Sequence, residues 1–271
     1  MSSSPAPTGF RAWFDVDMDS VELHQVAGGR AAVFCAGRPG KTSPNEDSLL
    51  MAQLDESRAV LAVADGAGGM RGGHRASRVA IETVAEFLTD EQLGSPRARL
   101  VSGIERAHDE VVGLGLGAAT TFAGVLIDEG TVRSVHVGDS VVLMCGQRGR
   151  RKLQTVSHSP VGYAVEAGIL DEREALRHED LHLVSNLLGV GDPRIEISTE
   201  VQMKPRDTIV IGSDGLFDNF VTDEIVEMVR KGDLLDVTVH LVEQTLRRMV
   251  DPPREGPGKP DDLGLIVFRS D

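Results

Sequence analysis

The hydrophobic pattern of the chain separates into short, continuous apolar runs and longer stretches with helical periodicity. Short apolar runs bounded by turn residues are typical of buried strands. Such runs occupy residues 58–65, 120–127, 131–139, 141–145, 207–215 and 263–268. Because the runs between 120 and 145 are separated only by turn residues, we expect them to form antiparallel hairpins with one another.

Apolar residues recur every three or four positions in three further segments, which predicts amphipathic helices. The first two helices span 74–88 and 96–112, and the third lies between the last two strands. Their apolar faces are formed by Ile81, Val84, Ala85 and Leu88, by Leu100, Ile104, Ala107 and Val111, and by Val239, Val242, Leu246 and Met249.

Two stretches give little pattern. Residues 1–29 are expected to form an N-terminal extension, in which Phe10, Trp13 and Phe14 are the side chains best suited to reach a core. A polar, helix-leaning stretch from about 157 to 190 interrupts the β-rich middle. Since no fixed period repeats, a repeat architecture is excluded.

Composition and charge narrow the class of protein. The 271 residues are 41% hydrophobic and 26% charged, as expected of a globular protein with a sizeable core. A formal net charge of −14 disfavours nucleic acid and anionic membranes as partners. The chain has two cysteines, no signal-peptide pattern and no run of about 18 apolar residues, so we expect it in the cytoplasm.

Aspartates stand at the edges of four apolar segments, and their surroundings are rich in glycine and serine. A single aspartate beside glycine is ordinary turn chemistry, but several at strand ends predict a carboxylate cluster. Such a cluster needs divalent cations or shared protons to offset its repulsion, and oxygen-only ligands favour magnesium or manganese over zinc. The aspartates concerned are Asp65, Asp139, Asp214 and the pair Asp261 and Asp262.

Seven short motifs occur in the order found in one enzyme family, and the similarity covers roughly residues 30–268. The chain resembles the type 2C metal-dependent serine/threonine protein phosphatases, the PPM family, in its bacterial branch. The motifs are NEDS (45–48), VADGAGG (63–69), ATTFAGVLI (119–127), VHVGDS (135–140), SHSPVGYAVEAGIL (157–170), IGSDGLFD (211–218) and KPDDLGLIVF (259–268).

The resemblance implies an α+β fold, a four-layer α-β-β-α sandwich of two antiparallel sheets flanked by helices. It implies a single protein phosphatase domain over residues 1–271, with 157–190 as a flap beside the active site. The reaction implied is hydrolysis of phosphoserine and phosphothreonine on proteins by a metal-activated water. The implied partners are phosphorylated proteins, the targets of a serine/threonine kinase, and we expect a monomer.

The resemblance also implies a centre with two Mn²⁺ or Mg²⁺ ions, beside which the bacterial branch has a weaker site for a third. Asp139, Asp214 and Asp218 match the third-ion site, and Asp262 is the alternative to Asp261 because Asp-Asp replaces the more usual Asp-Asn. The residues implied for the central pair are Asp65 as the bridging carboxylate, Gly66 through its carbonyl, Asp214 and Asp261, with Glu46 and Asp47 acting mainly through water.

Two positions depart from the family pattern. Thr42 stands where many members have a phosphate-binding arginine, which leaves Lys41 and Arg38 as substitutes, or as part of a solvated basic loop. Ala67 stands where animal-type members have a histidine that is a candidate general acid, and bacterial members commonly lack that histidine too.

Three other interpretations stay open at this point. Cys145 and Arg151 have the C-x5-R spacing of cysteine-dependent phosphatases, although the strand-like sequence that follows favours a hairpin turn. His158, His178 and His182 could suggest a metal site, but their spacing favours surface or core roles. The chain could also be a catalytically weak or inactive relative that binds phosphoproteins or switches partners, which its intact acidic positions disfavour.

Overall fold

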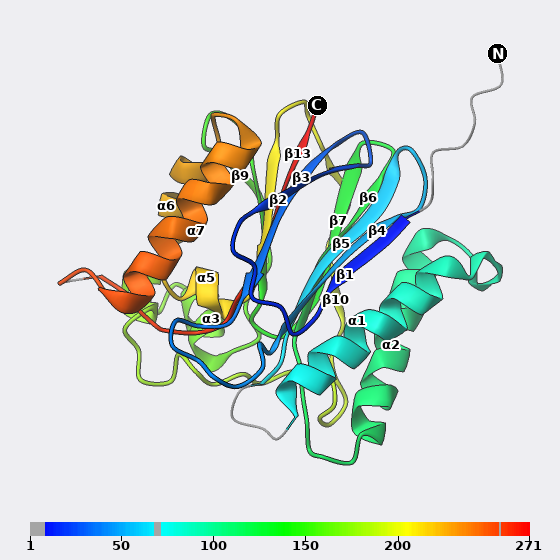
Figure 1. Cartoon of the computed structure of the whole chain (residues 1–271), viewed down its shortest axis with the longest axis horizontal. Helices are drawn as coiled ribbons and strands as arrows, with labels where there is room; N and C mark the ends of the chain where they lie inside the picture. The colour runs from blue at the N-terminus through cyan, green and yellow to red at the C-terminus, as the bar shows by residue number, and fades with distance from the viewer. Residues whose placement is uncertain (1–8, 68–71, 255) are drawn as a thin grey trace.

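Two antiparallel β-sheets pack face to face, and helices cover the outer face of each (Figure 1). The computed structural model describes residues 9–67, 72–254 and 256–271. The layers follow the order helix, sheet, sheet, helix, which confirms the α+β sandwich that the sequence implies. Residues 68–71 of the glycine-rich motif lie outside the described residues.

The first sheet is covered by a pair of long helices. Its strands follow the order β1-β4-β5-β6-β7-β10, and β11 also pairs with β7. The strands are β1 (Gly9–Trp13), β4 (Asp47–Gln53), β5 (Arg58–Asp65), β6 (Phe122–Asp128), β7 (Thr131–Val137), β10 (Glu196–Ile197) and β11 (Val201–Gln202). The covering helices are α1 (Gly73–Thr89) and α2 (Pro96–Gly113), joined through the short η1 (Glu91–Leu93).

The second sheet follows the order β2-β3-β13-β12-β8-β9 and carries helices on its other face. Its strands are β2 (Glu22–Val26), β3 (Gly29–Ala36), β13 (Leu263–Ser270), β12 (Thr208–Gly212), β8 (Val141–Cys145) and β9 (Arg151–Gln154). The helices are α6 (Thr222–Val229) and α7 (Leu234–Val250), with the short α3 (Pro160–Glu166), α4 (Glu172–Ala175) and α5 (Asp214–Phe217) near one end. Within the described ranges, no helix combines the length and apolarity needed to span a bilayer.

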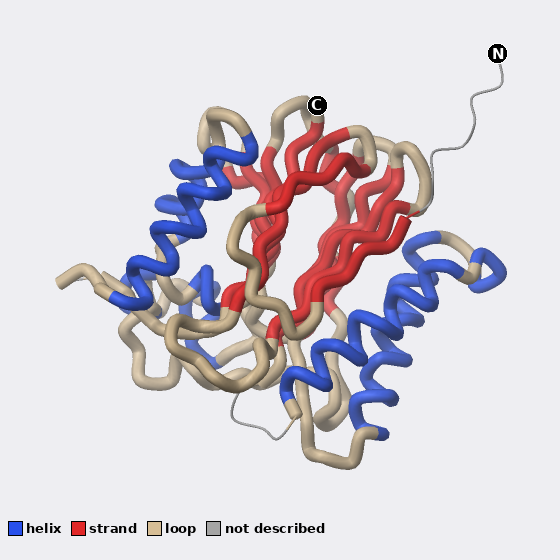
Figure 2. The backbone as a smooth tube through the Cα atoms, in the orientation of Figure 1, coloured by secondary structure: helices blue, strands red, loops and turns tan. Residues whose placement is uncertain are grey.

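The two sheets lie face to face (Figure 2), and apolar side chains from both fill the layer between them. Leu61, Val125, Ile211 and Phe268 are fully buried there. The outer faces bury a second set of side chains under the helices, which explains why the central strands are apolar on both faces rather than alternating. Ser95 caps α2 by accepting a hydrogen bond from the Ala98 amide at 3.3 Å.

The strands that the apolar runs predict are present, with one difference in how they pair. β5 has the bounds expected, and β6 and β7 pair as a hairpin. The expectation that 131–139 and 141–145 form a hairpin is wrong, because β8 pairs with β12 and β9 in the other sheet. Gly138, with φ of 107°, lies where the chain leaves the first sheet for the second.

From Gly9 onward, the N-terminal segment forms strands of both sheets rather than an extension outside them. β1 pairs with β4, and β2 pairs with β3, so residues from Gly9 onward belong to the edges of both sheets. Trp13 is buried and Phe14 packs against the core under the helices, whereas Phe10 is 38% exposed. Edge strands with mostly exposed side chains lack the apolar pattern that identifies the inner strands.

A glycine in α5 sets how closely this short helix approaches the second sheet. A Cβ atom added to Gly215 would lie 1.9 Å from the carbonyl oxygen of Asp262, just before β13. Only a residue without a side chain permits this approach, which brings Asp214 beside the Asp261–Asp262 pair.

We expect Gly215→Ala to lower the free energy of unfolding by about 2 kcal/mol or more, because the methyl group forces α5 away from β13. Gly113→Ala is the matched control: Gly113 ends α2 and has no atom within 4 Å of an added Cβ. Urea denaturation of both variants measures the difference. Equal unfolding midpoints for the two variants would show that this close approach is not needed.

Candidate metal centre

The acidic residues singled out by the sequence meet at one end of the two sheets. In antiparallel sheets, the end of one strand and the start of its neighbour lie at the same edge. Asp65 at the end of β5 and Asp47 at the start of β4 are therefore directly paired in the strand register. Asp214 begins α5 after β12, and Asp261 and Asp262 directly precede β13.

All of these side chains except Asp47 line one cavity of about 540 Å³. Asp47 is 1% exposed and does not line this cavity, and Asp218 lines a neighbouring one. The other candidate site residues from the sequence analysis do line this cavity. They are Arg38, Lys41, Glu46, Asp65, Gly66, Asp139, Asp214, Asp261 and Asp262, together with Ala67.

Asp47 and Asp65 are the directly paired carboxylates of the cluster, Asp47 buried and Asp65 half-buried. Burial raises the pKa of Asp47 well above its usual value; a 2.6 Å hydrogen bond from the Ser213 hydroxyl opposes the shift, and the charge of Asp262 adds to it. Burial, then the charges of Asp47 and Asp214, raises the pKa of Asp65 in the same direction. The carboxylates therefore lack sufficient positive charge around them.

The donor set fits hard divalent cations such as Mg²⁺ or Mn²⁺. The Oδ1 atom of Asp47 is buried without a hydrogen-bond partner, which leaves one carboxylate oxygen free inside the cluster. The other donors are carboxylates and the Gly66 backbone, all oxygen ligands of the kind these ions prefer. Gly66 must be glycine, since an added Cβ would lie 2.3 Å from the Gly73 backbone.

Asp261 and Asp262 have different surroundings. The Asp262 carboxylate is 4% exposed and accepts hydrogen bonds from the Arg38 amide at 2.9 Å and the Glu46 amide at 2.7 Å, as well as from Lys41 Nζ at 2.5 Å. The Asp261 side chain is 38% exposed. Asp262 therefore holds loop 38–46 in place, and Asp261 is the more accessible of the two.

Lys41 and Arg38, the two expected phosphate-binding residues, also differ. The Lys41 ammonium is 7% exposed and pairs with Asp262 and, at 3.1 Å, with Glu46. Burial lowers the pKa of Lys41, but the hydrogen bond and charge of Asp262 outweigh burial and raise it. Arg38 is exposed at the cavity. The charge of Lys41 is thus already balanced, which favours Arg38 as the residue available to an anion.

Lys259 is a further cation in the cluster, and the sequence pattern gave no reason to single it out. Its Nζ contacts Asp214, lies 2.8 Å from Asp218 Oδ2 and lies 3.4 Å from Asp261 Oδ2. Burial lowers the pKa of Lys259, but the charges of Asp214 and Asp218 outweigh that effect and raise it. Even with this lysine present, burial and the charge of Asp214 raise the pKa of Asp218 to about 8 and of Asp139 to about 7.

The flap segment contributes one histidine to the cavity. His182 is exposed and lines the cavity together with Leu183, Val184 and Leu187. The His178 ring instead accepts a hydrogen bond from the Asp180 amide at 3.1 Å, outside the cavity. Sequence spacing could not separate these two roles.

His158 belongs to a second cluster, with His136 and Glu196, that has the residue types of a metal site. The hydrogen bonds argue against that use. Gly138 N–H and the Asn186 amide both donate to His158 Nδ1, so the proton of the neutral ring lies on Nε2, which donates to Glu196 at 3.3 Å. With neither nitrogen free, His158 has a core role, as expected.

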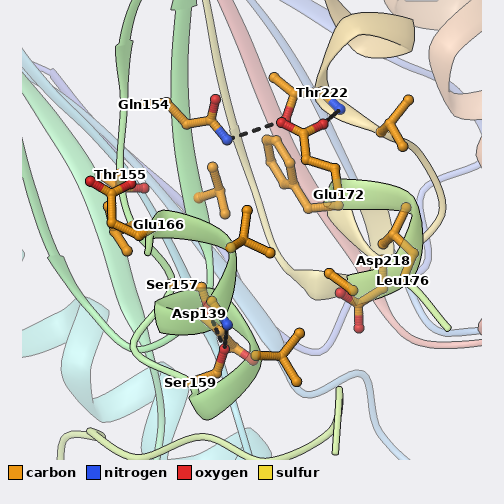
Figure 3. Close-up of a pocket in the computed structure, with 18 of the residues that line it drawn as sticks. Asp139, Gln154, Thr155, Ser157, Ser159, Glu166, Glu172, Leu176, Asp218 and Thr222 are labelled. Carbon is orange, nitrogen blue, oxygen red and sulfur yellow. Dashed lines mark hydrogen bonds between the residues drawn. The ribbon is translucent and has the colours of Figure 1, made fainter. Parts of the chain in front are cut away.

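A second cavity of about 330 Å³ lies between the flap helices α3 and α4, helix α5 and strand β9 (Figure 3). Asp139 lines both cavities, whereas Asp218 lines only this one. At its far end, Glu172 accepts a hydrogen bond from the Thr222 amide at 2.9 Å and Gln154 donates to the Thr222 hydroxyl at 3.2 Å. Asp139 therefore separates the main cavity from the space beneath the flap.

Cys145 and Arg151 do not form a phosphate-binding loop. Cys145 ends β8 and Arg151 begins β9, so the segment between them is the turn of a hairpin. Burial, with a smaller effect from Asp207, raises the pKa of Cys145 to about 11. A buried thiol with a raised pKa is a poor nucleophile, so the interpretation as a cysteine-dependent phosphatase is excluded.

Comparisons with known proteins agree with one another. A family model described as Protein phosphatase 2C matches residues 38–251. A putative protein phosphatase 2C-type from Streptococcus pyogenes is 29% identical over 205 residues, covering 72% of this chain and 82% of the relative.

Two solved structures have the same fold. The PPM Ser-Thr phosphatase MsPP from Mycobacterium smegmatis, in complex with cacodylate, is 26% identical with a TM-score of 0.73, covering 89% of this chain and 98% of that one. The catalytic domain of the phosphatase PstP, in complex with two manganese ions, is 23% identical with a TM-score of 0.69, covering 89% and 97%.

The Lys41–Asp262 ion pair can be tested in the absence of metal for its contribution to the stability of the protein. We expect Lys41→Met to lower the free energy of unfolding by about 2–4 kcal/mol, because it leaves a buried carboxylate without its cation. Adding Asp262→Asn should restore about 1 kcal/mol or more, since the double variant removes both charges. Chemical denaturation in chelator measures the cycle, and Lys231→Met at an exposed lysine is the control. Strictly additive effects would show that the two side chains do not stabilise each other.

Proposed function

The chain belongs to the protein phosphatase 2C family, and on that premise we propose that it hydrolyses phosphoserine and phosphothreonine residues of proteins. Metal dependence is general to this family. The observation that carries the proposal is the convergence of carboxylates from both sheets on one cavity, with a buried Asp47 oxygen left free. The MsPP phosphatase, similar in sequence and fold, supports the same substrate class.

We propose two Mn²⁺ or Mg²⁺ ions at the centre, held by Asp65 between them, the Gly66 carbonyl, Asp214 and Asp261. Glu46 and Asp47 would act on the ions mainly through water. When bound, such ions lower the pKa of a water molecule and stabilise the charge that develops at phosphorus. The accessible position of Asp261, compared with the fully engaged Asp262, supports this choice of ligand.

The remaining residues of the cavity suit an anionic substrate only when the carboxylates are neutralised. The excess negative charge of the carboxylates would repel a phosphate group. Binding of cations and binding of substrate are therefore coupled. Arg38, exposed at the cavity, would then pair with the phosphate oxygens. A serine leaving group needs a proton, which Ala67 cannot provide; His182 contributes the only imidazole among the described residues that line the cavity.

The flap and the termini belong to the same unit in this proposal. Segment 157–190 supplies His182 and three apolar residues to the cavity, as expected of a flap that contacts the substrate. β3 and β13 are neighbouring strands, which supports a single domain from the N-terminal strands to the C-terminus. The two cysteines are free and buried, in keeping with a cytoplasmic enzyme that reverses serine/threonine kinase signalling.

An inactive, phosphoprotein-binding relative would not need the complete acidic set. Asp65, Asp139, Asp214 and Asp261 are all present and all line the same cavity. Loss of Asp65 or Asp214 would have favoured the binding role, and their presence favours the enzyme.

We expect Asp65→Asn and Asp214→Asn each to reduce hydrolysis of a phosphoserine peptide by at least about a thousandfold, because each removes charge that holds an ion. The control is Asp109→Asn, at an exposed position on α2, which should retain activity. Turnover at saturating Mn²⁺ is measured alongside circular dichroism to confirm folding. Near-normal turnover of either site variant refutes the assignment.

Metal removal separates this chemistry from thiol chemistry in the unmodified protein. We expect a chelator to abolish hydrolysis, Mn²⁺ to restore it, and thiol alkylation to leave it unchanged because Cys35 and Cys145 are both buried. The opposite pattern, with activity that survives metal removal but not alkylation, would overturn the proposal.

The role of His182 is tested by comparing leaving groups. We expect His182→Gln to slow hydrolysis of phosphoserine peptide by about 10²-fold, the size typical of a lost general acid, while p-nitrophenyl phosphate loses little because its leaving group needs no proton. His178→Gln, in the same flap but outside the cavity, is the control. An equal loss on both substrates, or no loss, would remove His182 from the proton transfer.

A further inference from the structure

The Lys259 side chain reaches into the carboxylate cluster from the loop that precedes β13. Its ammonium contacts Asp214 Oδ2 and lies 2.8 Å from Asp218 Oδ2, with Asp261 Oδ2 at 3.4 Å. The side chain is 28% exposed, and the Asp218 and Asp214 side chains are 13% and 17% exposed. This is a largely covered group of charges rather than a surface ion pair.

The backbone on both sides of this lysine is fixed. Asn219, which is fully buried, accepts a hydrogen bond from the Lys259 amide at 3.0 Å and donates one to the Lys259 carbonyl at 2.9 Å. The same Asn219 amide group donates to the Gly215 carbonyl in α5 at 2.9 Å. Pro260 follows directly and restricts the next φ angle. The ammonium is therefore held against α5 by its own main chain.

The two carboxylates that Lys259 approaches most closely, Asp214 and Asp218, belong with Asp139 to the set that resembles a third-ion site. Covered carboxylates need a nearby positive charge. The lysine supplies it through hydrogen bonds to one oxygen of each aspartate, Oδ2. Asp214 can thus serve the central ions with one oxygen and the lysine with the other.

We propose that Lys259 is a tethered cation that takes the place of the third divalent ion, so that this chain holds two ions and not three. The proposal rests on the proposed function for the central pair alone. Because the ammonium is covalently attached, its presence beside the carboxylates does not depend on the metal concentration. It also blocks a divalent ion from the Asp214 and Asp218 oxygens that it contacts.

Titration of Mn²⁺ into the full-length protein, followed by calorimetry, tests this directly. We expect two equivalents for the unmodified chain and three for Lys259→Met, because the substitution frees the oxygens of Asp214 and Asp218. Adding Asp218→Asn to Lys259→Met should return the count to two. Lys231→Met, which removes an exposed lysine and changes the net charge equally, should leave the titration unchanged.

Thermal unfolding gives a second readout that does not depend on activity. In chelator we expect Lys259→Met to unfold at a lower temperature than the unmodified chain, because its carboxylates have lost their cation. Mn²⁺ should then raise its unfolding temperature by more than it raises that of the unmodified chain. Lys259→Gln, which keeps a polar side chain without the charge, replaces the methionine variant if the latter does not fold.

The results separate the two proposals. Three equivalents in the unmodified chain, or identical titrations of the unmodified chain and the Lys259 variants, would overturn the role of Lys259 and leave the proposed function standing. Binding of two Mn²⁺ ions without any hydrolysis of phosphopeptides would overturn the proposed function and leave the role of Lys259 standing.

Discussion

Repulsion among carboxylates at one end of the sandwich is the constraint on which the site depends. Buried Asp47 and half-buried Asp65 face each other across neighbouring strands, and Asp214 and Asp261 approach from the second sheet. A protein can tolerate such a group only if cations or protons offset the charge. This chain does so partly with two lysines of its own, and the free Asp47 oxygen marks where further positive charge is needed.

Lys41 and Lys259 each pair with a different subset of the carboxylates. Lys41 pairs with Asp262 and Glu46 and thereby holds loop 38–46 against the start of β13. Lys259 pairs with Asp214 and Asp218 on the side next to the flap cavity and offsets part of their charge. Between them, Asp65 and Asp261 face the main cavity, where the proposed ion pair would bind. The positions of the internal cations thus define which carboxylate oxygens remain for metal.

Much of this could be predicted from the sequence, because buried strands and amphipathic helices have strong local patterns. β5 and α1 follow from the apolar spacing alone, and Asp65 follows from its place at the end of β5. β1 and β2 could not be predicted, since edge strands expose most of their side chains. The lysine contacts could not be predicted either: Lys41 and Asp262 are 221 residues apart, and the choice between Asp261 and Asp262 depends on that contact.

Electron paramagnetic resonance of the Mn²⁺-loaded protein tests the central claim most directly, because it reports whether two ions share the Asp65 carboxylate. If Asp65 lies between the ions, the unmodified chain should give the spectrum of an exchange-coupled manganese pair, and Asp65→Asn should lose it. A spectrum of isolated, uncoupled Mn²⁺ in the unmodified, fully loaded chain would contradict the account.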